Sequence, residues 1–96
     1  MPTYEWQDRF TRDLRALDDN QQSQFRRAVD QFVQDLKTGT FRKGLRVKSV
    51  QGAPGVWEMT WADNGRATFQ YGTAKREGEP HIIWRRVGTH DVFGAP

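Results

Sequence analysis

The spacing of the hydrophobic residues changes near Gly39, and this change most limits the folds open to the chain. Before Gly39, apolar side chains recur every three to four residues, which is typical of a helix with one buried face. After it, apolar and polar side chains alternate, which is typical of a strand with one buried face. The 96-residue chain is also too short for two hydrophobic cores. We therefore predict a single α+β domain over residues 1–96.

Two helices are expected in the first half of the chain. The shorter one carries the apolar stripe Phe10, Leu14 and Leu17. The polar run 18–20 then interrupts the pattern, and each of its side chains could cap the helix that follows. Gly39 can supply the left-handed residue that ends this second helix. The longer stripe consists of Phe25, Ala28, Val29, Phe32, Val33 and Leu36.

An antiparallel sheet of about four strands is expected in the second half. The alternating segments are 45–50, 56–61, 66–71 and 81–84, and a short extra strand fits 2–6. The sequence Asp63-Asn64-Gly65 indicates a hairpin, because Asn-Gly accepts positive φ at low cost. We expect both helices to pack on one face of this sheet and to leave its other face to solvent.

The alternation predicts which polar side chains share that solvent face. Lys48 and Arg46 would join them if the 45–50 strand pairs with the 56–61 strand in register. Residues 41–96 carry nine basic and five acidic side chains, so the excess positive charge lies in the second half. Such an asymmetry suggests a surface that binds a polyanion. The expected set is Glu58, Thr60, Arg66, Thr68 and Gln70.

Composition excludes several classes of protein. The chain has no cysteine, which excludes disulfide scaffolds, zinc–thiolate sites and thiol nucleophiles. No apolar run is long enough to span a bilayer, and the acidic, Arg-containing first residues are unlike a signal peptide. Two histidines nine residues apart with scattered acids make a poor metal site. We therefore expect a cytoplasmic protein with no membrane partner, no metal and no cofactor.

Four short motifs, in this order, carry a family resemblance. They are Leu45-Arg46-Val47-Lys48, Trp57-Glu58-Met59, the strand 66–71 and Gly88-Thr89-His90-Asp91-Val92-Phe93. Together with the two preceding helices, they resemble the RelE/ParE superfamily of bacterial type II toxins. No single motif is diagnostic, but their order and spacing cover nearly the whole chain.

The resemblance implies a compact toxin that a cognate antitoxin protein neutralises. In the RelE branch it implies an endoribonuclease that cuts mRNA on the ribosome without a metal ion. In the ParE branch it implies an inhibitor of DNA gyrase. The RelE branch is the preferred interpretation, and the ParE branch and a non-toxic, basic nucleic-acid-binding module remain as alternatives.

The resemblance also implies roles for individual residues. Lys48 stands where the family carries strand lysines, and Arg66 where it carries the arginine that opens the next strand. His90 stands where members place a His or Arg near the end of the chain. Phe93 stands where many ribonuclease members have a Tyr, and this departure matters. A Phe can stack on a base, but it has no hydroxyl group for phosphate contact or proton transfer.

The chemistry of RNA cleavage gives similar candidates. The reaction needs a base for the 2′-hydroxyl, cationic donors for the phosphorane and an acid for the leaving 5′-oxygen. His90 suits the acid, because an unperturbed histidine titrates near pH 6.5. Either Glu58 or Lys48 could be the base, the lysine only if neighbouring cations depress its pKa. Arg66 and Lys48 are the cations expected to stabilise the phosphorane. The residues expected to bind RNA are Arg46, Lys48, Arg85, Arg86 and Phe93.

Each candidate also has a purely structural interpretation. His90 could pair with Asp91 on the surface, and Glu58 could simply neutralise Arg66. His81 follows a proline at the start of a strand and is expected to be structural. Of the pair 85–86, one arginine is expected to face solvent or RNA and the other to face inward or form a pair.

Overall fold

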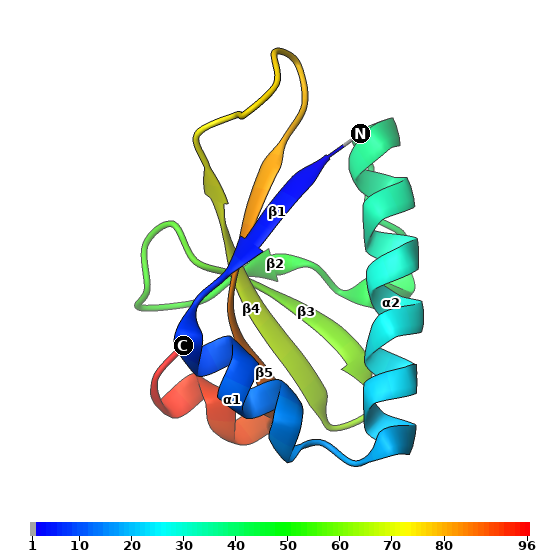
Figure 1. Cartoon of the computed structure of the whole chain (residues 1–96), viewed down its shortest axis with the longest axis vertical. Helices are drawn as coiled ribbons and strands as arrows, with labels where there is room; N and C mark the ends of the chain where they lie inside the picture. The colour runs from blue at the N-terminus through cyan, green and yellow to red at the C-terminus, as the bar shows by residue number, and fades with distance from the viewer. Residues whose placement is uncertain (1) are drawn as a thin grey trace.

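The structure is a computed structural model and describes residues 2–96 (Figure 1). Five strands, two helices and two short 3-10 helices follow one another along this part of the chain. In order they are β1 (Thr3–Trp6), α1 (Asp8–Ala16), α2 (Asp19–Thr38), η1 (Lys43–Leu45), β2 (Lys48–Ser49), β3 (Trp57–Ala62), β4 (Gly65–Gly72), β5 (His81–Thr89) and η2 (His90–Gly94).

The sheet has five strands in the order β1-β5-β4-β3-β2. The expectation of about four antiparallel strands is therefore wrong in two respects. β1, which matches the extra strand expected at 2–6, completes the sheet, and it runs parallel to β5. Backbone hydrogen bonds from Thr3 to Pro80 and from Gln7 to Trp84 fix this parallel pair at its two ends. The other neighbouring strands pair in the antiparallel sense.

The two helices form where the apolar stripes predict them. Asp18 is the N-cap of α2, and its side chain accepts a hydrogen bond from the backbone of Gln21, whose side chain accepts one in return. This reciprocal pair satisfies two backbone N–H groups that the first helical turn leaves free. Gly39 ends the helix at φ 80, a left-handed value that glycine adopts without strain.

The core lies between the helices and one face of the sheet. Phe32 of α2 is 1% exposed, and its ring lies 4.9 Å from that of Phe69 and 5.3 Å from that of Trp84. Phe10 of α1 lies 5.9 Å from Trp84 and so joins the same cluster. Phe32 and Phe69 meet edge to face, the two pairs with Trp84 are tilted, and rings at these separations bury large apolar areas. The expected alternation of β3 and β4 is thus confirmed at its central positions.

Two local details differ from the expectation. The 45–50 segment is a strand only at Lys48–Ser49, because Leu45 is buried in η1 and Arg46 adopts a left-handed φ of 48. The hairpin forms, but its glycine acts sterically rather than through a positive φ. A Cβ on Gly65 would come within 2.5 Å of the Trp61 ring, so only glycine lets the indole lie across the turn.

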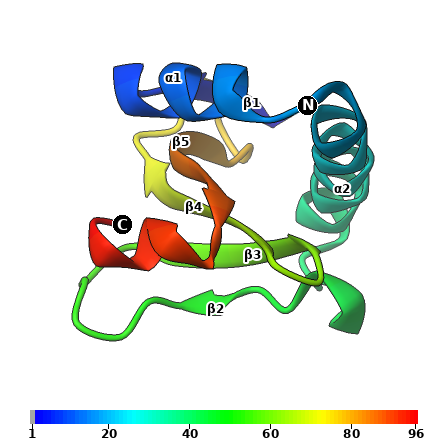
Figure 2. The same ribbon diagram turned by 90° about the horizontal axis from the view of Figure 1, so that it is seen from below.

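The face of the sheet away from the helices is partly covered, which the sequence did not predict. Figure 2 shows η2 and the residues after it on the side opposite α1. Gly88 makes this packing close, because a Cβ there would come within 3.1 Å of Val92. Thr68 is consequently 0% exposed and Glu58 8% exposed, although both were expected to face solvent. Within residues 2–96, no helix combines the length and apolarity needed to cross a membrane.

Candidate functional site

A row of polar residues crosses the sheet on the face opposite the core, and its last member lies beside α1. Lys48 pairs with Glu58, Glu58 pairs with Thr68, and Thr68 pairs with Arg86. Directly paired residues point to the same face, so these four side chains lie side by side on successive strands. The conditional expectation that Lys48 joins Glu58 on this face is confirmed.

Lys48 and Glu58 form an ion pair within this row. The lysine Nζ lies 3.5 Å from the carboxylate Oε1. The lysine side chain is 70% exposed, whereas the glutamate side chain is only 10% exposed. The pair therefore presents an exposed cation to solvent beside a largely buried carboxylate.

Arg66 lies in the next row, opposite Gly88. Its Nη1 donates to the backbone oxygens of Ala62, Asp63 and Gly65, at 3.2, 3.2 and 2.8 Å. One nitrogen atom of the guanidinium thus stabilises the β3–β4 turn through three hydrogen bonds. The expected pairing with Glu58 does not form among the described residues, since Glu58 binds Lys48 instead.

The two adjacent arginines of β5 lie at an irregularity of the strand. Phe69 pairs with Trp84 and Thr68 pairs with Arg86, so Arg85 is an extra residue with no partner opposite it. This is the pattern of a β-bulge, which redirects side chains. Arg85 donates from Nη1 to the Gln70 side chain at 2.6 Å, and from Nε to the oxygen of Pro96 at 3.1 Å.

Arg86 binds a carboxylate on α1. Its Nε lies 2.6 Å from Oδ2 of Asp13, and its Nη2 donates to Oδ1 at 3.1 Å. The side-chain hydrogen bond that Arg86 donates to Asp13 raises the pKa of Arg86 above its ordinary value. Of the two arginines, Arg86 is therefore the one that forms an ion pair. Asp13 was missed by sequence reasoning, because it lies 73 residues away and no local pattern links the two.

His90 and Phe93 lie on η2, which follows β5 directly. Their rings meet edge to face with centroids 4.7 Å apart. The His90 side chain is exposed, and no ion pair with Asp91 forms within the part of the chain described. Arg66 pairs with Gly88, two residues before His90, so both lie at the same end of the sheet. Arg46, an exposed residue after η1, lies outside the row because it is not in β2.

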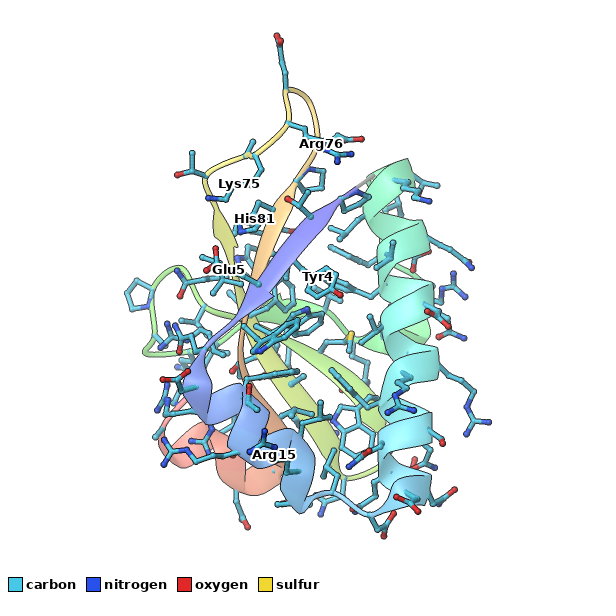
Figure 3. The ribbon with its side chains drawn as sticks, in the orientation of Figure 1. Tyr4, Glu5, Arg15, Lys75, Arg76 and His81 are labelled. Carbon is cyan, nitrogen blue, oxygen red and sulfur yellow. The ribbon has the colours of Figure 1, made fainter. Side chains whose placement is uncertain are left out.

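His81 has a structural position, as expected. It is 4% exposed, its Nδ1 lies 2.7 Å from the hydroxyl of Thr3, and its Nε2 lies 2.7 Å from Oε1 of Glu5. Figure 3 shows Glu5 and His81 near each other at β1 and β5. The same view places Lys75 and Arg76 on the loop that extends beyond these strands.

A separate apolar groove of about 580 Å³ lies between β1 and the two helices. Tyr4 and Trp6 beside it are 63% and 53% exposed, and their rings stack with centroids 5.6 Å apart. The groove holds no cluster of titratable groups, so the candidate chemistry lies on the opposite face. Within residues 2–96, no group of three or more His, Asp or Glu side chains is arranged to hold a metal ion.

Comparisons with known proteins give a consistent result at the level of the fold. No family model matches the chain, and no curated protein sequence does. Solved structures do match. A chain of the E. coli DinJ–YafQ complex is 13% identical, with a TM-score of 0.66 and coverage of 96% of this chain and 97% of that one.

Two further structures are similar. The YoeB/ParE toxin from Agrobacterium tumefaciens is 10% identical, with a TM-score of 0.67 and coverage of 92% and 98%. A chain of the RelB–RelE antitoxin–toxin complex from Methanococcus jannaschii is 15% identical, with a TM-score of 0.60 and coverage of 93% of each chain. On this structural evidence, the chain has the RelE-like toxin fold.

Proposed function

We propose that this protein is the toxin of a type II toxin–antitoxin system and that it cleaves mRNA on the ribosome. The observation that carries the proposal is the polar row across the sheet within a RelE-like fold. A carboxylate, two types of cation and an exposed histidine at one face are the groups that RNA cleavage by acid–base catalysis requires.

The proposed base is the Glu58 carboxylate. It takes the proton from the 2′-hydroxyl, whose oxygen then attacks the adjacent phosphorus. Lys48 supports this role, because its ammonium lies 3.5 Å away and fixes the carboxylate between itself and the sheet. Lys48 is also exposed enough to reach a phosphate oxygen, as an additional cation for the transition state.

The proposed acid is His90, as an imidazolium that gives a proton to the leaving 5′-oxygen. The products are then a 2′,3′-cyclic phosphate and a free 5′-hydroxyl, with the proton balance closed between Glu58 and His90. Phe93 holds the imidazole ring by edge-to-face contact and also offers its own ring face to a base.

The proposed phosphate ligands are Arg66 and Arg85. Arg66 uses Nη1 for the turn carbonyls, and it lies opposite Gly88, at the end of β5 where His90 follows. Arg46 and Arg86 are less suited to direct contact. Arg46 lies outside the row, and Arg86 is committed to Asp13.

An inhibitor of DNA gyrase is the second candidate function. One observation favours it: Arg66, Arg85, Arg86 and Lys48 all have partners within the chain. Cations that already have partners within the chain are less available to stabilise a transition state, so they fit a non-catalytic binding surface better than a catalytic site. Under this proposal mRNA would stay intact while DNA supercoiling would fail.

We also propose an antitoxin protein as the partner. Two of the similar structures, DinJ–YafQ and RelB–RelE, are complexes of a toxin with its antitoxin. The exposed Tyr4 and Trp6 beside an apolar groove support a protein partner, because a monomer rarely exposes such a patch without use. Coexpression with the product of a neighbouring gene should restore growth and recover both chains in one complex.

The test is induced expression of the chain in bacteria, with primer extension on abundant mRNAs. Wild type and His90→Ala are compared at equal protein levels. Growth arrest with discrete cuts that the variant lacks would support the nuclease. Growth arrest with intact mRNA would favour gyrase inhibition, and normal growth with both chains would count against a toxin.

A further inference from the structure

Two hydrogen-bond donors from neighbouring strands converge on one oxygen atom, the backbone oxygen of Pro96. The Thr68 hydroxyl donates to it at 3.2 Å, and Arg85 Nε donates to it at 3.1 Å. Thr68 is 0% exposed, and the guanidinium of Arg85 is held by Gln70 at 2.6 Å. A buried hydroxyl and a fixed guanidinium N–H aimed at a single oxygen are donors well suited to a phosphate oxygen.

The oxygen belongs to a short segment that folds back over the sheet. We call Ala95 and Pro96 the strap. The Ala95 oxygen accepts from Arg86 Nη1 at 3.0 Å and from Arg9 Nη1 at 3.4 Å. The strap therefore places the backbone oxygens of two successive residues against three arginines and a threonine. An anion could equally accept these hydrogen bonds.

We propose that Thr68 and Arg85 form a phosphate site, and that the strap covers this site until a phosphodiester displaces it. The inference deepens the proposed function, on which it rests for the identity of the natural anion. It adds a binding residue, Thr68, and an autoinhibitory contact to the polar row.

Charge determines which occupant the site prefers. Arg85 is a cation, and hydrogen bonds to an ionised acceptor are about twice as strong as those between neutral groups, so charge favours an anion at this site. The carboxylates nearest the site are Glu58, opposite Thr68, and Asp13, on Arg86. Each of them is bound to its own cation, Lys48 or Arg86, so neither leaves an uncompensated negative charge beside Arg85.

A single substitution can release the strap without changing the site. Ala95 has a φ of −152, and its N–H donates to the Val92 oxygen at 3.2 Å. Proline holds φ near −65 and has no N–H, so Ala95→Pro cannot keep this conformation. Ala95→Val is the matched control, because it retains the N–H and tolerates an extended φ.

The experiment is a titration of the full chain with inorganic phosphate, followed by NMR at the Thr68 amide and the Arg85 Nε–H. A site that is covered nine-tenths of the time binds roughly tenfold more weakly than the open site. We therefore expect Ala95→Pro to bind phosphate about tenfold more tightly than wild type and Ala95→Val. In wild type, phosphate should shift the Ala95 amide signal toward the position typical of an alanine in an unstructured chain.

Arg85→Gln in the Ala95→Pro chain should remove the added affinity. Equal affinity in all of these chains, or shifts confined to surface cations, would overturn the proposal. So would tight binding in wild type with the Ala95 signal unmoved. Because phosphate binding needs no RNA cleavage, the site can stand if the nuclease proposal fails, and the nuclease can stand if the site fails.

Discussion

Asp13 and Arg86 join α1 to the bulge of β5 through a two-point ion pair, with Nε 2.6 Å from Oδ2 and Nη2 3.1 Å from Oδ1. Asp13 Oδ2 also accepts from the backbone N–H of Val87 at 3.2 Å. One carboxylate thus satisfies a guanidinium and a strand amide. The contact fixes the short helix against the part of β5 that lies beyond β1.

Asp13→Ala should therefore destabilise the fold. It leaves a partly buried guanidinium and a backbone N–H without an acceptor, at a cost of about 1–3 kcal/mol. Urea denaturation monitored by tryptophan fluorescence measures the change. The control is Arg12→Ala on the exposed side of α1, for which we expect a change within about 0.5 kcal/mol. Equal stability of the two variants would contradict a structural role for the pair.

Gly65→Ala should destabilise the β3–β4 hairpin. The added Cβ would lie 2.5 Å from the Trp61 ring, which must then move from a position where its Nε1 donates to the Arg66 oxygen at 3.0 Å. Overpacking of this kind costs about 1–3 kcal/mol. Gly44→Ala is the control, since no atom lies within 4 Å of its added Cβ. A thermal melt of both variants should lower the Tm only for Gly65→Ala.

The pair of Asp35 and Arg42 should make the fold sensitive to acid. The side-chain hydrogen bond from Arg42, followed by that from its backbone N–H, lowers the pKa of Asp35 below its ordinary value of 3.8. Because the folded pKa lies below the unfolded one, this stabilisation is fully present above pH 3.8 and is lost as the pH falls through the folded pKa.

Asp35→Asn cannot lose a proton, so its stability should depend less on pH in this range. We expect wild type to be more stable at pH 7, with the difference shrinking steadily below pH 3.8. Urea midpoints at several pH values give the comparison. A constant difference between the two chains at all pH values would argue against the ion pair as its source.

The two histidines should separate stability from activity. His81→Leu removes the hydrogen bonds to Thr3 and Glu5 and should lower the free energy of unfolding by about 1–3 kcal/mol, with cleavage per folded molecule unchanged. His90→Gln should leave stability unchanged, because its side chain is exposed, and should lower cleavage by about 10²–10⁴-fold. The reverse pattern would show that the proposal names the wrong histidine as the acid.

Local patterns predicted the elements, because each depends on neighbours in the sequence. The stripe of α2, its cap at Asp18 and its end at Gly39 all follow from helical periodicity and backbone freedom. The strand alternation likewise put Glu58 and Arg66 on one face. The parallel pairing of β1 with β5 could not be read in this way, because its residues lie nearly eighty positions apart.

The covering of the sheet face was missed for a related reason. Nothing in the sequence between 90 and 96 indicates that its backbone oxygens will accept from Thr68, Arg85 and Arg86. Periodicity places side chains on a face but does not show which backbone groups return to it. A count of free cations from the sequence therefore overestimated the exposed positive charge at this face.

The most direct test of the nuclease proposal uses purified protein with ribosomes that carry a defined mRNA. The RNA ends are mapped after incubation with wild type, His90→Gln and Gly44→Ala. We predict discrete cuts that end in a 2′,3′-cyclic phosphate with wild type and Gly44→Ala, and a loss of about 10²–10⁴-fold with His90→Gln. Intact mRNA with folded wild-type protein, or equal cutting by His90→Gln, would contradict the proposed chemistry.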